Sequence, residues 1–407
     1  MDIKKSLIWT GFLRFFTRGL TIIKTLVLAR ILTPSQFGIF GVAALVLGLL
    51  ETLTETGVNV VLIQEKKDIK HYLSTGWVVS ILRGFLISSI IFLLAPLITN
   101  FFHSPESIHS LLVISLIPII RGFINPAVVN YQKKLEFNNE FRFRGSLILI
   151  EVVFTVIFGL IIRNETAFVL GMIVSSLLEV CLSFVLIKDK PSIEFNIEKL
   201  KYVFAKGKWI TGAKIFEYLF SHGDDIVVGK ILGIYPLGLY QQAYKISSLS
   251  ITEVAETFQK VTFPLYSKMI NNGESVKKIY LKTLLATSLI IIPVGVAILL
   301  FPEQIILIIL GKNWLEAVNV LRVLAIFGII KTIANSSFPL LLAFKRQDLV
   351  LYLTLIGILG LGISIYPLIN IYGLIGAGLS TIIGSLVMLP PAFYWIRQIL
   401  QKKNIND

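Results

Sequence analysis

The chain has 407 residues, of which 55% are apolar, 29 are Gly and only 15% are charged. Soluble domains average about 45–50% apolar residues with Gly counted and about 25% charged residues, so this composition excludes a soluble globular protein and a disordered chain. The mean hydropathy of +0.81 indicates a membrane protein with many spans. The net charge of +14 then needs an explanation, because charges are costly in lipid.

Stretches of about 20 mostly apolar residues, long enough to cross a bilayer as a helix, recur along the whole chain. Twelve are predicted to be transmembrane helices: 7–32, 37–63, 76–100, 109–130, 145–163, 166–187, 208–232, 239–265, 281–301, 316–343, 348–370 and 374–397. The first, seventh and eighth are the least apolar, so a hydropathy scan alone would miss them. The first stretch has no small-residue cleavage site and is expected to be a retained span rather than a signal peptide.

Lys and Arg residues are distributed very unevenly over the connections between these spans. With the N-terminus inside, 24 of the 38 fall on the inner side and two, Arg163 and Lys312, on the outer side. The other twelve lie within spans. Cytoplasmic loops of membrane proteins carry an excess of Lys and Arg, so both termini are predicted to be cytoplasmic.

The second half of the chain repeats the first. Residues 28–32 (LARIL) match residues 228–232 (VGKIL) at an offset of 200. A further match at an offset of 210 pairs Arg121 with Lys331 and Asn125 with Asn335. Six spans separate the copies, and an even number preserves orientation, so the repeats are parallel, as in one class of transporters.

The expected fold is therefore an all-α polytopic membrane protein with twelve transmembrane helices in two six-helix lobes. Residues 1–187 form the N-terminal lobe and residues 208–407 form the C-terminal lobe. Residues 188–207 join them as a basic, amphipathic linker that is expected to lie on the cytoplasmic membrane surface.

Charged residues inside the spans are expected to face one another or a water-filled cavity, because each costs roughly 2.5–3.5 kcal/mol at the bilayer centre. Helical spacing places Arg14, Arg18 and several Thr residues on one face of the first span, and Lys245 lies on a similar polar face of the eighth. Such stripes either form interhelical ion pairs or line a central cavity, and their length favours the cavity. Isolated Glu151 and Glu179 are interpreted as structural counter-charges.

Basic residues outnumber acids in the spans, which favours an anionic substrate, and Arg and Lys are the usual phosphate ligands. The predicted substrate contacts are Arg14, Arg18 and Lys214, with Lys245, Arg121 and Lys331 as second choices. Four acids are candidates for binding a coupling H⁺ or Na⁺: Glu55, Asp224, Asp225 and Glu256. They serve equally well as counter-charges to Lys214, Lys245 and Lys24.

Nothing in the sequence points to catalysis. It has no Gly-rich phosphate-binding loop, its single Cys181 forms no intramolecular disulfide, and its four His residues lack ligand spacing. We therefore expect no enzyme activity, no metal, no cofactor and no nucleic-acid partner. A membrane glycosyltransferase or polymerase is disfavoured because the outer loops are short.

Several motifs resemble the polysaccharide-transport branch of the multidrug/oligosaccharidyl-lipid/polysaccharide exporter superfamily. They are residues 28–40 (LARILTPSQFGIF), their repeat at 232–244 (LGIYPLGLYQQAY), 204–207 (FAKG), 263–267 (FPLYS) and 310–314 (LGKNW). The resemblance implies a flippase for undecaprenyl-diphosphate-linked sugar repeat units in the bacterial inner membrane, acting in O-antigen, capsule or exopolysaccharide synthesis. It also implies alternating access through a cationic cavity between the lobes.

The partners expected on this basis are the lipid-linked oligosaccharide, membrane lipids and membrane proteins of polymer assembly. The main alternative is a drug or small-cation exporter on the same fold. Such an exporter requires an accessible carboxylate pocket in the first lobe, where Glu51 and Glu55 are the candidates.

Overall fold

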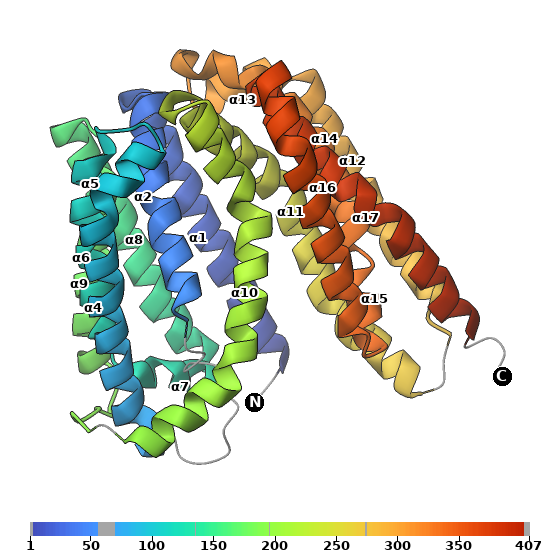
Figure 1. Ribbon diagram of the computed structural model, residues 1–407. Coiled ribbons are helices and arrows are strands. Elements are labelled where there is room, and N and C mark those ends of the chain that lie inside the picture. The colour runs from blue at the N-terminus through green and yellow to red at the C-terminus, as the bar shows by residue number, and fades with distance from the viewer. Residues whose placement is uncertain (1–2, 56–69, 135, 195, 273–274, 403–407) are drawn as a thin grey trace. The chain divides into compact units, whose positions relative to one another are not determined.

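The computed structural model describes residues 3–55, 70–134, 136–194, 196–272 and 275–402, and every element in these ranges is a helix (Figure 1). The all-α class predicted from the sequence is confirmed. For some helical residues the structure describes the backbone only, and these are residues 3–8, 10, 70–72, 197–211, 213, 249–250, 252–258, 260–261 and 402.

By its internal contacts the chain divides into two compact units, residues 1–218 and 219–407. The first unit contains α1 (Ile3–Ile31), α2 (Pro34–Leu53), α4 (Lys70–Phe101), α5 (Ser107–Ile114), α6 (Leu116–Gly122), η1 (Pro126–Val129), α7 (Asn130–Lys133), α8 (Phe137–Ile162), α9 (Thr166–Val185) and the beginning of α10 (Ile197–Ile231). The second contains the rest of α10, α11 (Ile234–Asn271), α12 (Lys277–Leu300), α13 (Pro302–Ile309), η2 (Lys312–Ala317), α14 (Val318–Asn335), α15 (Phe338–Ala343), α16 (Gln347–Tyr372) and α17 (Leu374–Lys402).

The division between the units falls inside α10, whereas the sequence places a lobe boundary at the linker 188–207. Two contacts explain the difference. Lys214 Nζ donates a hydrogen bond to Glu55 Oε1 at 2.5 Å, and the Tyr218 hydroxyl donates to the Leu45 carbonyl at 2.6 Å. The beginning of α10 thus packs with the first unit, and the lobes 1–187 and 208–407 stay a prediction.

Each predicted span coincides, in its described part, with one helix or with consecutive helices. Among the described residues, eight helices are long and apolar enough to cross a membrane, or nine if the bent pair Ser107–Gly122 and Pro126–Lys133 is one span. The helices α1, α10 and α11 are not among them, and these are the spans that the sequence identifies as least apolar. The protein is therefore a multi-pass membrane protein, while the number twelve stays a prediction.

Two glycines allow α4 and α6 of the first unit to touch backbone to backbone. A Cβ atom on Gly84 would lie 2.3 Å from the Pro118 carbonyl oxygen, and one on Gly122 would lie 2.9 Å from the Ser80 carbonyl oxygen. Any larger side chain would force these helices apart, because the interior of a protein is close-packed. The same helices share an apolar core with α2, α5 and α9.

The fourth predicted span is broken rather than continuous. After α6 the chain bends by 73° into η1 and α7. Asn125 stabilises the break, because its Oδ1 accepts a hydrogen bond from the Ala127 backbone N–H at 3.0 Å and its Nδ2 donates to the Asp189 carbonyl at 2.8 Å. The repeat-related Asn335 likewise lies at a helix break, since α14 ends there and α15 begins at Phe338.

Candidate functional site

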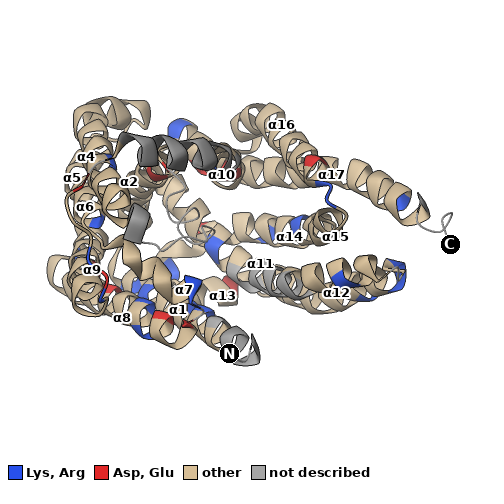
Figure 2. Cartoon of the chain, turned by 90° about the horizontal axis from the view of Figure 1, so that it is seen from below, with Lys and Arg blue, Asp and Glu red and all other residues tan. Residues whose placement is uncertain are grey.

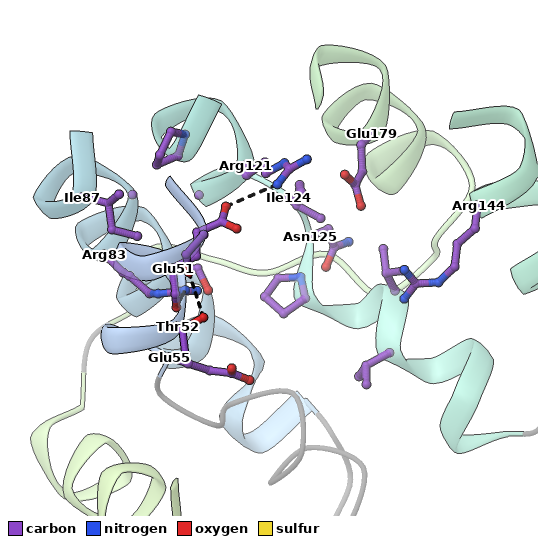
Figure 3. A pocket seen from close by; sticks show the side chains of 18 of the residues that line it. Glu51, Thr52, Glu55, Arg83, Ile87, Arg121, Ile124, Asn125, Arg144 and Glu179 are labelled. Carbon is purple, nitrogen blue, oxygen red and sulfur yellow. Dashed lines mark hydrogen bonds and ion pairs between the residues drawn. The ribbon is translucent and has the colours of Figure 1, made fainter. Parts of the chain in front are cut away.

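The first unit contains a cavity of about 560 Å³ between α2, α4, α6, α8, α9 and α10 (Figure 3). Its volume is within the range of small-ligand sites, about 300–1,000 Å³. The polar side chains that line it are Glu51, Thr52, Glu55, Ser80, Arg83, Arg121, Asn125, Gln132, Arg144, Glu179 and Tyr218. Ionisable residues within membrane spans mark functional sites by default, so this cavity is the leading candidate.

On one side of the cavity, two arginines contact the end of α2. Arg121 Nη1 lies 3.2 Å from Glu51 Oε1, and its Nε donates a hydrogen bond to Ser176 Oγ at 3.3 Å. Arg83 Nη2 donates to the Glu51 carbonyl at 2.6 Å, and its Nε donates to Thr54 Oγ1 at 3.0 Å. Figure 3 shows Arg83, Glu51 and Arg121 as one cluster. About one third of the side chains of Arg121 and Glu51 is exposed, so a ligand in the cavity can reach both.

On the other side, Arg144 and Glu179 face the cavity from α8 and α9 (Figure 3). Buried Glu140 orients Arg144 by accepting a hydrogen bond from its Nε at 2.9 Å. The same oxygen of Glu140 also accepts from Gln132 Nε2 at 2.6 Å, which fixes the segment after the helix break.

The ionisable side chains that line this cavity are equal in number, with three arginines and three glutamates. Glu51 is paired with Arg121, and Glu55 is paired with Lys214 at 2.5 Å. An anion that binds Arg121 must therefore compete with the Glu51 carboxylate. The predicted cationic cavity between the lobes is a different feature and stays a prediction.

The second unit holds a separate polar cluster around the end of α10. Asp224, only 2% exposed, accepts hydrogen bonds from the Tyr240 hydroxyl at 2.7 Å and from the Asp225 backbone N–H at 3.0 Å. His222 Nδ1 lies 3.3 Å from Asp225 Oδ2. Both buried aspartates thus have partners inside their own unit.

Lys331 of the second unit lies within a group of aromatic rings. Its Nζ is 5.2–5.9 Å from the ring centroids of Phe220, Tyr244 and Phe327, and it donates a hydrogen bond to the Tyr244 hydroxyl at 3.2 Å. Cation–π contacts of this kind stabilise a desolvated ammonium group.

Lys245, another predicted substrate contact, is half-buried on α11.

The helix α1 carries Arg14, which is half-buried, and Arg18, which is exposed. The threonines of the same stripe donate to carbonyls of their own helix, as Thr17 does to Arg14 and Thr21 does to Thr17. Neither arginine is among the residues that line the cavity of the first unit. Arg121 lines that cavity and Lys214 binds one of its glutamates, so the structure brings two of the six predicted substrate contacts together there.

The predicted acids divide in the same way. Glu55 lines the cavity of the first unit, Asp224 and Asp225 lie in the cluster of the second, and the side chain of Glu256 lies outside the described residues. Glu151 accepts a hydrogen bond from Lys24 Nζ at 2.6 Å, which confirms its interpretation as a counter-charge. No group of three or more His, Cys, Asp or Glu side chains among the described residues is arranged to hold a metal ion.

A family model described as polysaccharide biosynthesis protein matches residues 27–319, more than half of the chain. The chain belongs to this family. Lipopolysaccharide biosynthesis protein WzxC of Escherichia coli (strain K12) is 24% identical to it over 344 residues, which cover 84% of this chain and 70% of WzxC.

Solved structures identify the fold of this polysaccharide biosynthesis protein. Lipid II flippase MurJ in an inward closed conformation matches it with a TM-score of 0.75 over 98% of this chain and 90% of MurJ, at 18% identity. An inward-facing multidrug resistance MATE family transporter of the MOP superfamily matches with a TM-score of 0.71 over 95% and 94% of the two chains, at 14% identity. At these identities the likeness shows the fold alone, and it agrees with the superfamily resemblance of the sequence motifs.

One wall of the cavity does not follow from the sequence of this family member. A fifth span at 145–163 leaves Arg144 in a connection outside the span, whereas α8 begins at Phe137 and includes it. Glu179 lines the cavity, and its interpretation as a structural counter-charge stays a prediction. One signal was available: Arg-Gly occurs at 18–19, 83–84, 121–122 and 144–145, and three of these four arginines line the cavity.

Proposed function

We propose that this protein is a flippase that carries a lipid-linked oligosaccharide across the bacterial cytoplasmic membrane. Its family, the naming of WzxC for lipopolysaccharide biosynthesis and the fold shared with the lipid II flippase MurJ support this function. The substrate is a sugar repeat unit on undecaprenyl diphosphate. Transport makes and breaks no covalent bond, so the protein acts as a transporter and not as an enzyme.

The observation that carries the proposal is the group of three arginines around one cavity inside an apolar helix bundle. Arginine keeps its charge when buried and binds phosphate through two parallel hydrogen bonds. A protein with no anionic cargo would gain little from keeping Arg83 and Arg121 beside an open space, because charge within the membrane is costly.

Binding would proceed by exchange of partners. Arg121 is held by the Glu51 carboxylate at 3.2 Å, in a pair that is one-third exposed. A diphosphate carries more charge than one carboxylate, so it would displace Glu51 and take the guanidinium group. The released carboxylate would then repel the anion or accept a proton, which gives a physical reason for the substrate to leave again.

The remaining predicted contacts complete the proposed transport path. Arg14, Arg18, Lys214, Lys245 and Lys331 would contact the diphosphate or acidic sugars as access alternates between the two membrane faces. Glu55, Asp224, Asp225 and Glu256 would bind a coupling H⁺ or Na⁺. Both termini would lie in the cytoplasm, and membrane proteins of polymer assembly would receive the flipped unit.

The second candidate function is export of a drug or small cation. It is favoured by one observation: Glu51 and Glu55 do line a cavity in the first unit. However, both carboxylates are already paired, with Arg121 and Lys214 respectively, so a cation would have to displace a lysine or an arginine. The description of the family and the naming of WzxC for lipopolysaccharide biosynthesis make the flippase the better-supported function.

Deletion of the gene tests the two functions against each other. A flippase mutant accumulates lipid-linked oligosaccharide on the cytoplasmic leaflet, where added membrane-impermeant lectins or glycosidases on the outer face do not reach it. Unchanged distribution of the lipid-linked sugar, together with altered sensitivity to dyes or antibiotics, would instead establish the exporter.

The α1 arginines are tested by substitution. Arg18→Ala should abolish polymer export in the deletion strain while leaving the amount of protein in the membrane unchanged. Arg163→Ala, which removes an exposed Arg beyond the end of α8, is the matched control and should export normally. Normal polymer output from the Arg18 variant would remove α1 from the substrate path.

A further inference from the structure

A second cavity, of about 540 Å³, lies in the first unit beside the segment 124–134, where the fourth predicted span is broken. Within the segment 124–134, the two cavities are lined by different residues. Ala127, Asn130, Tyr131 and Lys134 line the second cavity, whereas none of these four lines the first. The second cavity is therefore a separate site on another face of the segment.

Hydrogen bonds and aromatic packing hold the walls of the second cavity together. Asn130 Nδ2 donates to Asp189 Oδ2 at 3.2 Å, and Asn125 Nδ2 donates to the Asp189 carbonyl at 2.8 Å. These bonds fasten the chain after α9 to the broken segment. Phe143, only 1% exposed, packs with its ring centroid 6.1 Å from that of Tyr131.

Three basic side chains from three separate segments surround this cavity. Lys134 follows α7, Arg142 lies near the beginning of α8, and Lys188 follows α9; all three are exposed. None of them forms an ion pair with a described residue. Figure 2 shows Lys and Arg positions beside α7 and α8.

Two acids also line the cavity, but each is engaged by an amide. Asp189 accepts from Asn130, and Glu136 Oε2 accepts from Asn139 Nδ2 at 3.0 Å. These hydrogen bonds stabilise the carboxylates without using the basic groups. Three cations therefore stay available for a ligand from outside the chain.

The surroundings of the cavity indicate where that ligand comes from. The Lys and Arg distribution predicts that residues 131–144 and 188–207 lie on the cytoplasmic side. Next to the cavity, Val185 is 77% exposed and Leu186 is 52% exposed, as expected of a surface that faces lipid. The basic groups thus adjoin an apolar face at the level of the inner leaflet headgroups.

We propose that this cavity binds the phosphodiester headgroup of an anionic phospholipid of the inner leaflet. Lys134, Arg142 and Lys188 hold the phosphate, and the acyl chains lie along Val185 and Leu186. Basic pockets between helices on the cytoplasmic side are suited to such headgroups, and each Lys or Arg near an anionic surface strengthens binding about fivefold. The bound lipid stabilises the segment 124–134 on a face that does not line the first cavity.

The test is native mass spectrometry of the full chain with phosphatidylglycerol or phosphatidylcholine added at equal concentration. We expect the protein to retain phosphatidylglycerol preferentially. The triple variant Lys134→Ala, Arg142→Ala and Lys188→Ala should lose at least tenfold in affinity for it. The matched control Lys277→Ala, Lys278→Ala and Lys282→Ala removes the same charge from exposed positions on the second unit and should bind like the wild type. Equal losses in both variants would show diffuse attraction and overturn the site.

Two further measurements keep the result decisive. If the triple variant is unstable, the single changes Arg142→Glu and Lys188→Glu, both at exposed side chains, should each weaken phosphatidylglycerol binding at least fivefold. Inorganic phosphate is added in a parallel experiment. If phosphate alone occupies the site and displaces the lipid at millimolar concentration, the ligand is a soluble phosphate and the lipid proposal is wrong.

Discussion

Arg121 and Lys331 occupy matching positions of the internal repeat, yet their surroundings are opposite in character. Arg121 points into a polar cavity and contacts Glu51 and Ser176. Lys331 lies among the rings of Phe220, Tyr244 and Phe327. Each lies four residues before a repeat-related Asn at a helix break. The repeat thus conserves a cation before a helix break, while its neighbours decide whether that cation is open to a ligand or held by aromatic rings.

Of the effects that test this comparison, the largest is expected at Arg121. Arg121→Ala should lower export of the lipid-linked sugar about a hundredfold, because it removes a charge-assisted contact worth up to about 3 kcal/mol. Arg121→Lys keeps the charge without the two-pronged geometry and should recover part of the loss. The measurement is polymer output in a deletion strain at equal protein level. Wild-type output from Arg121→Ala would contradict the assignment of the cavity.

The next effect is on the stability of the second unit. Tyr240→Phe removes the hydroxyl that donates to Asp224, which is 2% exposed, and should cost about 2 kcal/mol. Thermal unfolding of the purified protein in detergent measures it. Tyr372→Phe, at an exposed ring, is the control. Equal melting temperatures for both variants would mean that Asp224 needs no donor from Tyr240.

A smaller loss of export is expected from Lys331→Met. The unbranched side chain keeps the packing against the three rings and loses the cation–π attraction, about 1 kcal/mol. Export should fall less than tenfold, which separates Lys331 from Arg121. A loss as large as that of Arg121→Ala would show that Lys331 holds the substrate as strongly as Arg121 does.

The smallest effect tests how α10 joins the first unit. Tyr218→Phe removes one hydrogen bond to the Leu45 carbonyl and should cost about 1 kcal/mol, since the ring still packs against Gly48. Thermal unfolding measures the loss, with Tyr352→Phe at an exposed ring as the control. No change in stability would mean that water replaces the lost donor.

Composition and periodicity were sufficient to predict the helical membrane fold, because the apolar spans dominate the sequence. They also identified α1, α10 and α11 as the least apolar spans. Helix ends were less predictable, since polar first turns extend a helix beyond its apolar part. The helix α8 shows this, because it begins at Phe137 and so carries Arg144 into the cavity.

The site was only partly predictable for a related reason. Helical spacing tells which charges share one face, but not which face of another helix lies opposite. Lys24, for example, meets Glu151 on α8, which is 127 residues away in the chain. Arg83 lies within the predicted span 76–100, but only its contacts with Glu51 and Thr54 place it at the cavity.

The backbone contact between α4 and α6 has a consequence for how a transport cycle can run. Arg83 and Arg121 each precede a glycine of that contact, and neither glycine leaves room for a sliding side chain. The two helices should therefore move as one rigid body, and their guanidinium groups should keep a constant separation through the cycle. An anion would meet two positive charges at fixed positions on this side of the cavity. Changes in its affinity during the cycle would therefore come from the opposite wall, where α8 and α9 carry Arg144 and Glu179.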